Sequence, residues 1–106
     1  MGMSERRNHP REDLNWDLTL AHSCHGTLRG RLRNYSIGGM YITLHATDRP
    51  TQGMATLRIY REDVMLMVRG SIVHSDAEGV GIMVNEPVTV VELFNGTVYE
   101  VSQQVA

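Results

Sequence analysis

The stretch GTLRGRLRNYSIGGMYITL, residues 26–44, decides the fold. Both of its halves alternate with a period of two, and a Gly-Gly pair separates them. The positions on the less polar face are Leu28, Gly30, Leu32, Met40, Ile42 and Leu44. Period two is typical of a half-buried strand, and the glycine pair is typical of a turn. The stretch therefore predicts two consecutive strands with one face toward a core.

The same alternation continues on both sides of this stretch. One run precedes it, at residues 16–22, and three follow it, at 55–59, 64–72 and 80–84. Turn-forming Gly, Asp and Pro residues separate them, and no helical pattern lies between them. Six short strands at this spacing predict a mainly β domain, either an antiparallel barrel or a sandwich. Gly70 inside the fifth run predicts a bulge or a sharp bend in a long strand.

The two ends of the chain differ from the middle. Residues 1–15 are polar and interrupted by proline, which predicts a flexible N-terminal arm ahead of a barrel at 16–86. At 87–106 the apolar residues fit one helical face, although valines and a glycine weaken helix propensity. We predict a short C-terminal helix that closes one end of the barrel, with an extra hairpin as the alternative.

Composition limits the possible functions. The 106 residues are enough for one domain. A formal net charge of -2 argues against general binding to nucleic acid or to a membrane surface, since both need a large basic excess. A single cysteine excludes an internal disulfide. The chain has no apolar stretch long enough for a signal peptide or a membrane span, so we expect a cytoplasmic location.

Two short motifs carry the functional signal. Arg7 and Arg11 form an R-x-x-x-R element in the arm, directly preceded by Arg6. Residues 34–39 form a [DN]-x-S-x-x-G element at the end of the second strand. Either motif alone is weak, but their order, ahead of a late Gly-Val-Gly strand at 79–84, is specific. With these motifs the chain resembles the PilZ domain family over nearly its whole length.

The resemblance implies a six-stranded PilZ-type barrel that binds cyclic di-GMP and catalyses no reaction. It also implies the ligand-binding residues, which are Arg6, Arg7, Arg11, Asn34, Ser36 and Gly39. The chemistry agrees, because a guanidinium can form paired hydrogen bonds with phosphate or with guanine and can stack on a base. We expect the arm to become ordered over the ligand. An arginine at position 6 further implies an intercalated ligand dimer.

Several individual residues qualify this hypothesis. Asn34 offers one acceptor oxygen where aspartate would offer two, so we expect weaker binding than an aspartate would give. We expect Ser36 to share its strand face with Asn34, and Gly39 to allow a positive φ and close approach of the ligand. Arg33 and His74 are further candidates for ligand contact.

Other functions remain as alternatives. His22, Cys24 and His25 invite a metal site, but they lack a convincing fourth ligand, and we predict no metal and no cofactor. An enzyme is not expected, because no recognisable catalytic motif is present. A nucleic-acid-binding barrel would need more aromatic residues and positive charge. The main alternative is a nucleotide-independent adaptor for pilus, flagellar or polysaccharide machinery. A downstream protein partner in motility or biofilm control is compatible with either function, but the sequence does not identify it.

Overall fold

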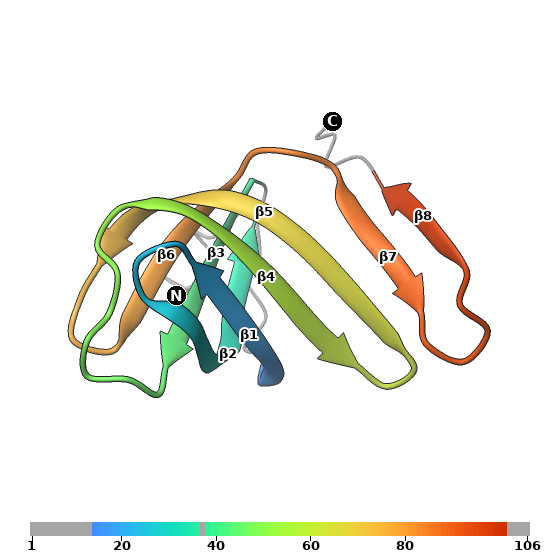
Figure 1. Cartoon of the computed structure of the whole chain (residues 1–106), viewed down its shortest axis with the longest axis horizontal. Helices are drawn as coiled ribbons and strands as arrows, with labels where there is room; N and C mark the ends of the chain where they lie inside the picture. Colours follow the sequence, from blue (N-terminus) through green and yellow to red (C-terminus); the bar gives the residue numbers. More distant parts are fainter. Residues whose placement is uncertain (1–13, 37, 102–106) are drawn as a thin grey trace, which may run out of the picture.

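The computed structural model describes residues 14–36 and 38–101. The elements within these ranges are all strands (Figure 1). They are β1 (Trp16–His22), β2 (Gly26–Ser36), β3 (Gly39–Leu44), β4 (Gly53–Arg61), β5 (Val64–Ser75), β6 (Gly79–Val84), β7 (Val88–Glu92) and β8 (Val98–Val101).

Six of the strands close into a barrel. They pair in the order β4-β1-β2-β3-β6-β5, and an additional β4–β5 pairing joins the two ends. Every one of these pairings is antiparallel. The predicted six-stranded antiparallel barrel is therefore confirmed. Closure also leaves the barrel without a free sheet edge.

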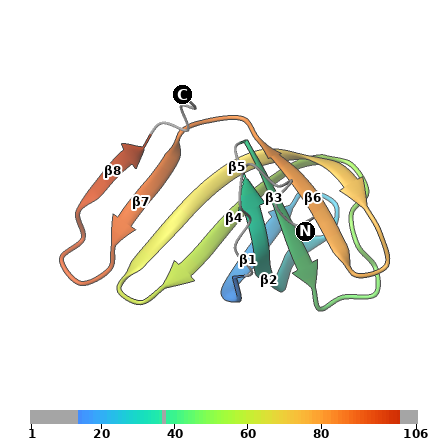
Figure 2. The same cartoon turned by 180° about the vertical axis from the view of Figure 1, so that it is seen from behind.

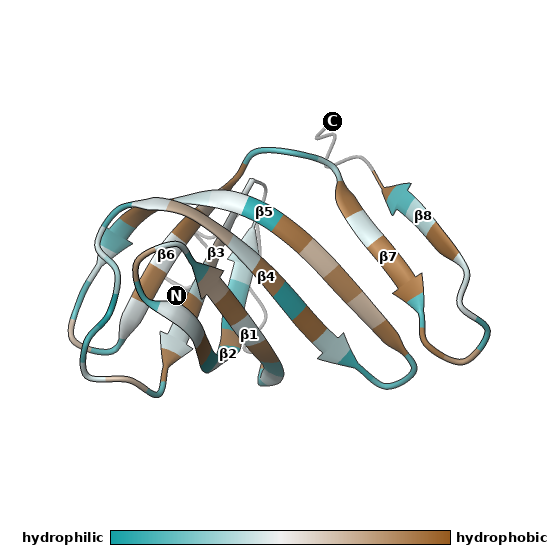
Figure 3. Cartoon of the chain, viewed as in Figure 1, coloured by the Kyte–Doolittle hydropathy of each residue, from teal (hydrophilic) through white to brown (hydrophobic). Residues whose placement is uncertain are grey.

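The core lies inside the barrel and consists of the alternating apolar positions. Its most deeply buried members, each at most 1% exposed, are Leu20, Leu32, Ile42, Leu57, Ile59, Val68, Val80 and Ile82. Leu32 and Ile42 belong to the face that the alternation within 26–44 predicted to point inward, and the others lie in the further alternating runs. Since neighbouring residues point outward and are more polar, the strands in Figure 3 carry alternating bands of hydropathy.

Strand β5 serves two parts of the molecule. Its residues 64–72 pair with β4. On its other side, residues 64–67 pair with β7, whereas the later residues pair with β6. Gly70 lies where β6 approaches, and a Cβ there would overlap the Met83 carbonyl oxygen. The register shift of β5 falls later, between Ile72 and His74. Gly70 thus permits close strand contact, and the bulge predicted there is displaced to Val73.

The C-terminal helix prediction is wrong. Residues 88–101 instead form the β7–β8 hairpin, and the alternative that we considered is the observed one. Three features explain this outcome. Its valines are β-branched and favour strands, Gly96 adopts a positive φ of 77° at the turn, and the Asn95 side chain accepts a hydrogen bond from the Thr97 amide at 3.0 Å. The hairpin projects from the first half of β5 beside the barrel, as both Figure 1 and Figure 2 show. We call this hairpin the wing.

None of the described residues belongs to a helix that could cross a membrane.

Candidate functional site

The corner between β2 and β3 carries the second motif. Asn34 pairs with Tyr41, and Ser36 pairs with Gly39, so the motif spans the end of one strand and the start of the next. Gly38 in the turn has a φ of +77°, a conformation that favours glycine. Gly39 is not among the glycines with positive φ. The positive φ that we expected at Gly39 is therefore adopted by its neighbour.

A bulge turns the motif toward the outside of the barrel. Leu32 points into the core, and strict alternation would point Asn34 inward as well. The β2–β3 register shifts between these two residues, with Arg33 as the extra residue. Because a bulge reverses the phase of the side chains beyond it, Asn34 and Ser36 lie on the outer face. The expectation that these two side chains share a face is met.

A second bulge, in β5, likewise turns a side chain toward the outside of the barrel. Ile72 is buried and pairs with Ile82, whereas His74 pairs with Gly81 after the register shift at Val73. His74 is thereby directed outward. Four outward-facing positions then form one row across four strands, in the order Asn34, Tyr41, Gly81 and His74.

This row borders a pocket of about 420 Å³ on the outer surface. The pocket is lined by Asn34, Ser36, Gly39, Met40, Tyr41, Val73, Gly81 and Ile82. All three barrel-side residues of the motif are thus brought to one hollow. Gly39 and Gly81 add no side chain to the pocket and so leave it open. A Cβ on Gly39 would meet no atom closer than 3.5 Å, so barrel packing does not require glycine there.

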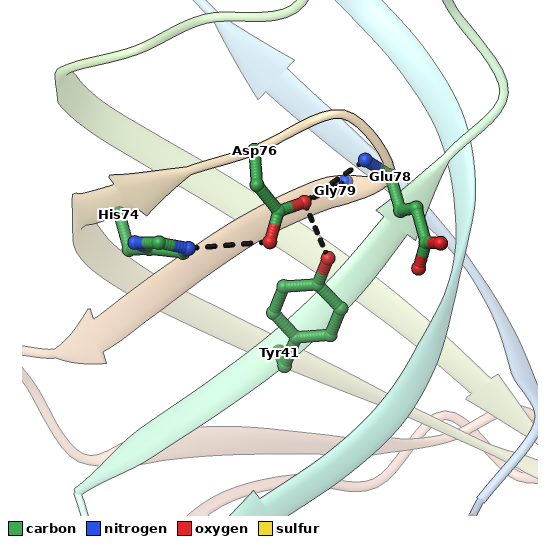
Figure 4. A network of polar contacts seen from close by, with 5 residues as sticks. All are labelled: Tyr41, His74, Asp76, Glu78 and Gly79. Atoms are coloured by element: carbon green, nitrogen blue, oxygen red, sulfur yellow. Dashed lines mark hydrogen bonds and ion pairs between the residues drawn. The ribbon is translucent and has the colours of Figure 1, made fainter.

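A hydrogen-bonded network holds one lining residue of this pocket, Tyr41 (Figure 4). The Tyr41 hydroxyl donates to Asp76 Oδ1 at 2.7 Å. The same oxygen accepts from the backbone amides of Glu78 at 2.9 Å and Gly79 at 3.0 Å, which closes the β5–β6 turn. His74 Nε2 lies 3.2 Å from the other oxygen, Oδ2. One carboxylate therefore ties β3, β5 and the β5–β6 turn together.

The network shifts the pKa values of its members. Burial, followed by the hydrogen bond to Asp76 and its negative charge, raises the pKa of Tyr41 to about 12. The hydrogen bond from Tyr41, followed by those from the backbone amides, holds the pKa of Asp76 well below its usual range. At neutral pH the phenol is thus protonated and the carboxylate charged. Neither group is tuned to exchange protons near neutral pH.

The structure places the remaining candidates in different ways. His74 ends the row and pairs with Gly81, but it is not among the residues that line the pocket, so its contact with a ligand stays a prediction. Arg33 lies exposed at its bulge, and its carbonyl accepts a hydrogen bond from the Leu14 amide at 2.8 Å. The arginines at 6, 7 and 11 lie outside the described residues.

The histidine and cysteine group around β1 has structural contacts. His22 Nε2 lies 2.8 Å from the Gln52 carbonyl oxygen, and the Cys24 amide donates to His22 Nδ1 at 3.1 Å. His25 lies 3.5 Å from an Asp48 carboxylate oxygen. Within residues 14–36 and 38–101, no three His, Cys, Asp or Glu side chains gather as metal ligands. Both nitrogens of the His22 ring are engaged with backbone groups.

Sequence reasoning missed Tyr41, Asp76 and Gly81. The alternation of 40–44 already places Tyr41 on the outer face, and Gly81 is the second glycine of the Gly-Val-Gly element. Both were therefore visible as outward positions, although nothing in the sequence paired them. The role of Asp76 depends on a contact with a residue 35 positions away. Only the folded barrel reveals that contact.

Comparison with known families gives one match. The model of the PilZ domain family matches residues 5–95, a range that includes both motifs, the whole barrel and β7. A comparison with curated proteins gave no match. Since the family model covers most of the chain, and the folded motif lies on a closed six-stranded barrel, this chain belongs to the PilZ domain family.

Proposed function

We propose that this PilZ domain is a receptor for cyclic di-GMP, and that it binds the nucleotide at the outer pocket between β2, β3, β5 and β6. The observation that carries the proposal is the convergence of Asn34, Ser36 and Gly39 on one hollow. Its volume of about 420 Å³ falls within the usual range for small-molecule pockets. Family membership supports the ligand assignment.

The chain course supports a role for the arm. The Leu14 amide bonds to Arg33, next to Asn34, so the described chain begins beside the motif corner. At roughly 3.3–3.6 Å per extended residue, the chain can span at most about 11 Å from Leu14 to position 11 and about 25 Å from Leu14 to position 7. Both guanidinium groups are therefore within reach of a ligand in the pocket. We assign them to the phosphates or guanine edges, where paired hydrogen bonds are strongest.

In this proposal, ligand binding orders the arm across the pocket, and Arg6 contacts the second molecule of an intercalated dimer. His74 and Arg33 border the bound nucleotide. The ordered arm changes the surface that a downstream protein meets, and no chemical conversion of the ligand is involved. The receptor acts in the cytoplasm, where the nucleotide is available.

Calorimetric titration with cyclic di-GMP tests the proposal, with GTP and cyclic GMP as control nucleotides. Arg7→Ala should weaken binding by about 1.5–3 kcal/mol, the scale of a charge-assisted hydrogen bond. Ser36→Ala should weaken it by about 1 kcal/mol. A stoichiometry of two ligands per chain is expected for the wild type, and of one for Arg6→Ala.

Two outcomes would contradict this assignment. Wild-type protein that shows no binding at millimolar cyclic di-GMP would favour the nucleotide-independent adaptor. Equal binding of all three nucleotides would remove the guanine-specific role of the pocket.

A further inference from the structure

A second surface lies on the other side of β2. On the outer face of β1, β2 and β4, Thr19 pairs with Arg29 on one side and with Arg58 on the other. Arg31 lies one row along and forms an ion pair with Asp17 at 3.3 Å. Within the described part of the chain, neither Arg29 nor Arg58 forms an ion pair. Positive charge therefore exceeds negative charge on this face, although the whole chain is acidic.

A small pocket lies among these basic residues. Its volume is about 210 Å³, and its lining residues are Asp17, Leu18, Thr19, Arg29, Gly30, Arg31, His45 and Tyr60. Arg29 has no ion pair within the described residues, whereas Arg31 already pairs with Asp17, which also lines the pocket. The hydroxyl-bearing residues Thr19 and Tyr60 complete the polar lining. Arginine forks match a carboxylate with paired hydrogen bonds.

An apolar strip continues from the basic pocket. Along one cross-strand row, Tyr60 pairs with Met65, Met65 with Val91, and Val91 with Val98. Along the next row, Arg58 pairs with Met67. Tyr60 is 41% exposed and Val98 is 60% exposed, and the residues between them are half-buried. We call Arg29, Arg31, Arg58 and this strip the convex face.

Strand β5 explains why this strip is apolar. Its first five residues, Val64 to Val68, are hydrophobic on both faces of the sheet, as the continuous band in Figure 3 shows. Only one of these faces contributes to the barrel core. A strand with one solvent-facing side normally alternates between apolar and polar residues, so the second apolar side needs another explanation.

We propose that the convex face is the docking site for an acidic segment of a partner protein. An acidic side chain of that segment enters the pocket beside Arg29, and its apolar side chains cover Met65, Met67 and Val91. Arginine, tyrosine and methionine around an apolar centre are the residue types enriched in protein interfaces. The excess of arginine selects an acidic occupant by charge complementarity.

The convex face shares no residue with the nucleotide pocket. Binding of the acidic segment to this face does not require the nucleotide. The inference rests on the proposed function in one respect, that the bound partner is the one to which the receptor passes its signal. The two sites can therefore be tested separately.

The test uses the full chain and a capped hexapeptide that alternates glutamate with leucine. Amide chemical shifts are followed during titration with the peptide, without nucleotide. We expect the perturbed amides to lie on β1, β2, β4, β5 and β7, and the affinity to fall as salt is added. Arg29→Glu should weaken binding by about tenfold or more, the equivalent of one charged contact.

Arg69→Glu is the matched control, because it changes the net charge equally but reverses an exposed arginine that already faces Glu86 at 4.0 Å. It should leave peptide affinity within about twofold, since exposed pairs contribute little. If both variants weakened peptide binding equally, the affinity would depend only on net charge, and the proposal would be overturned. An unchanged affinity in Arg29→Glu would do the same.

Other occupants give distinct results. Shifts of the same amides on raising the protein concentration, without peptide, would assign the face to a second copy of the chain. Preferential binding of a single-stranded oligonucleotide at these amides would assign it to nucleic acid. Either result would overturn the proposal. Cyclic di-GMP titration of Arg29→Glu then separates the two sites, because its nucleotide affinity should equal that of the wild type.

Discussion

The two glycines of the Gly-Val-Gly element should respond differently to the same substitution. Gly79 pairs with Thr43 where β6 approaches β3 most closely. A Cβ on Gly79 would overlap the Ile42 carbonyl oxygen and lie 2.8 Å from both the Ile42 carbonyl carbon and Thr43 Cα. These are backbone atoms, which cannot rotate away. Gly79→Ala therefore forces β3 and β6 apart at this end.

The cost follows from that separation. Overpacking a close contact costs about 1–3 kcal/mol. The neighbouring hydrogen bond from the Leu44 amide to the Glu78 carbonyl, 3.2 Å long, would be lost at about 1 kcal/mol. We expect Gly79→Ala to lower the free energy of unfolding by about 2–4 kcal/mol. A domain of this kind has a total stability of about 5–15 kcal/mol, so the variant should still fold.

Gly81→Ala is the matched control. Its new Cβ would approach the His74 Cβ at 3.3 Å and would otherwise face the open pocket. Both substitutions restrict the unfolded chain to the same extent, so that effect cancels in the comparison. Urea unfolding, followed by the fluorescence of Trp16, the only tryptophan in the chain, measures both variants. Equal midpoints for Gly79→Ala and Gly81→Ala would refute the reasoning.

Four further predictions follow from the pocket. Gly81→Leu should fill the space between Tyr41 and His74 and weaken cyclic di-GMP binding by about tenfold or more, with an unfolding midpoint close to that of Gly81→Ala. Asn34→Asp should strengthen nucleotide binding by about 1 kcal/mol in calorimetry, and equal or weaker binding would show that this side chain does not meet a guanine edge. Tyr41 should ionise near its raised pKa of about 12 in an absorbance titration, and Asp76→Asn should bring that pKa back toward 10.0. Because the pKa of Tyr41 is raised in the folded state, the stability that Tyr41 contributes is complete below pH 10 and is lost as the pH rises toward about 12. Because the pKa of Asp76 is lowered, the stability that Asp76 contributes is present above about pH 4 and is lost in acid. Unfolding midpoints of wild type and Asp76→Asn across pH measure both effects.

The barrel could be predicted because its signal is local. One buried face on each strand imposes a period of two, and residues such as Leu20, Leu57 and Ile82 are fixed by that period alone. The turns carry glycine, aspartate and proline, which mark the ends of the strands. Family motifs then indicated which corner of the barrel carries the candidate site.

The two bulges could not be predicted in the same way. A bulge is an extra residue relative to the pairing with the neighbouring strand, and the residue types at Arg33 and Val73 do not indicate one. Alternation alone would have buried His74. The network around Asp76 was hidden for a related reason, since its members come from distant parts of the chain. The arginine arm remains a prediction.

The prediction of a C-terminal helix was wrong for a different reason. Short apolar runs such as 88–92 fit both a helix face and a strand, and periodicity over so few residues does not separate them. The valine content and the Asn95-Gly96 pair were the better guides, because they reflect intrinsic strand and turn preferences.

The attachment of the wing has a consequence for how the molecule comes apart. Four residue pairs connect β7 to β5, while barrel closure depends on the β4–β5 seam. The wing can therefore unfold locally while the barrel remains closed. Amide protons of β8 should exchange with solvent first and those of the seam last. A protease that cuts the loosened hairpin would remove part of the convex face and leave the candidate pocket in place, so the two proposed binding activities should be lost one at a time.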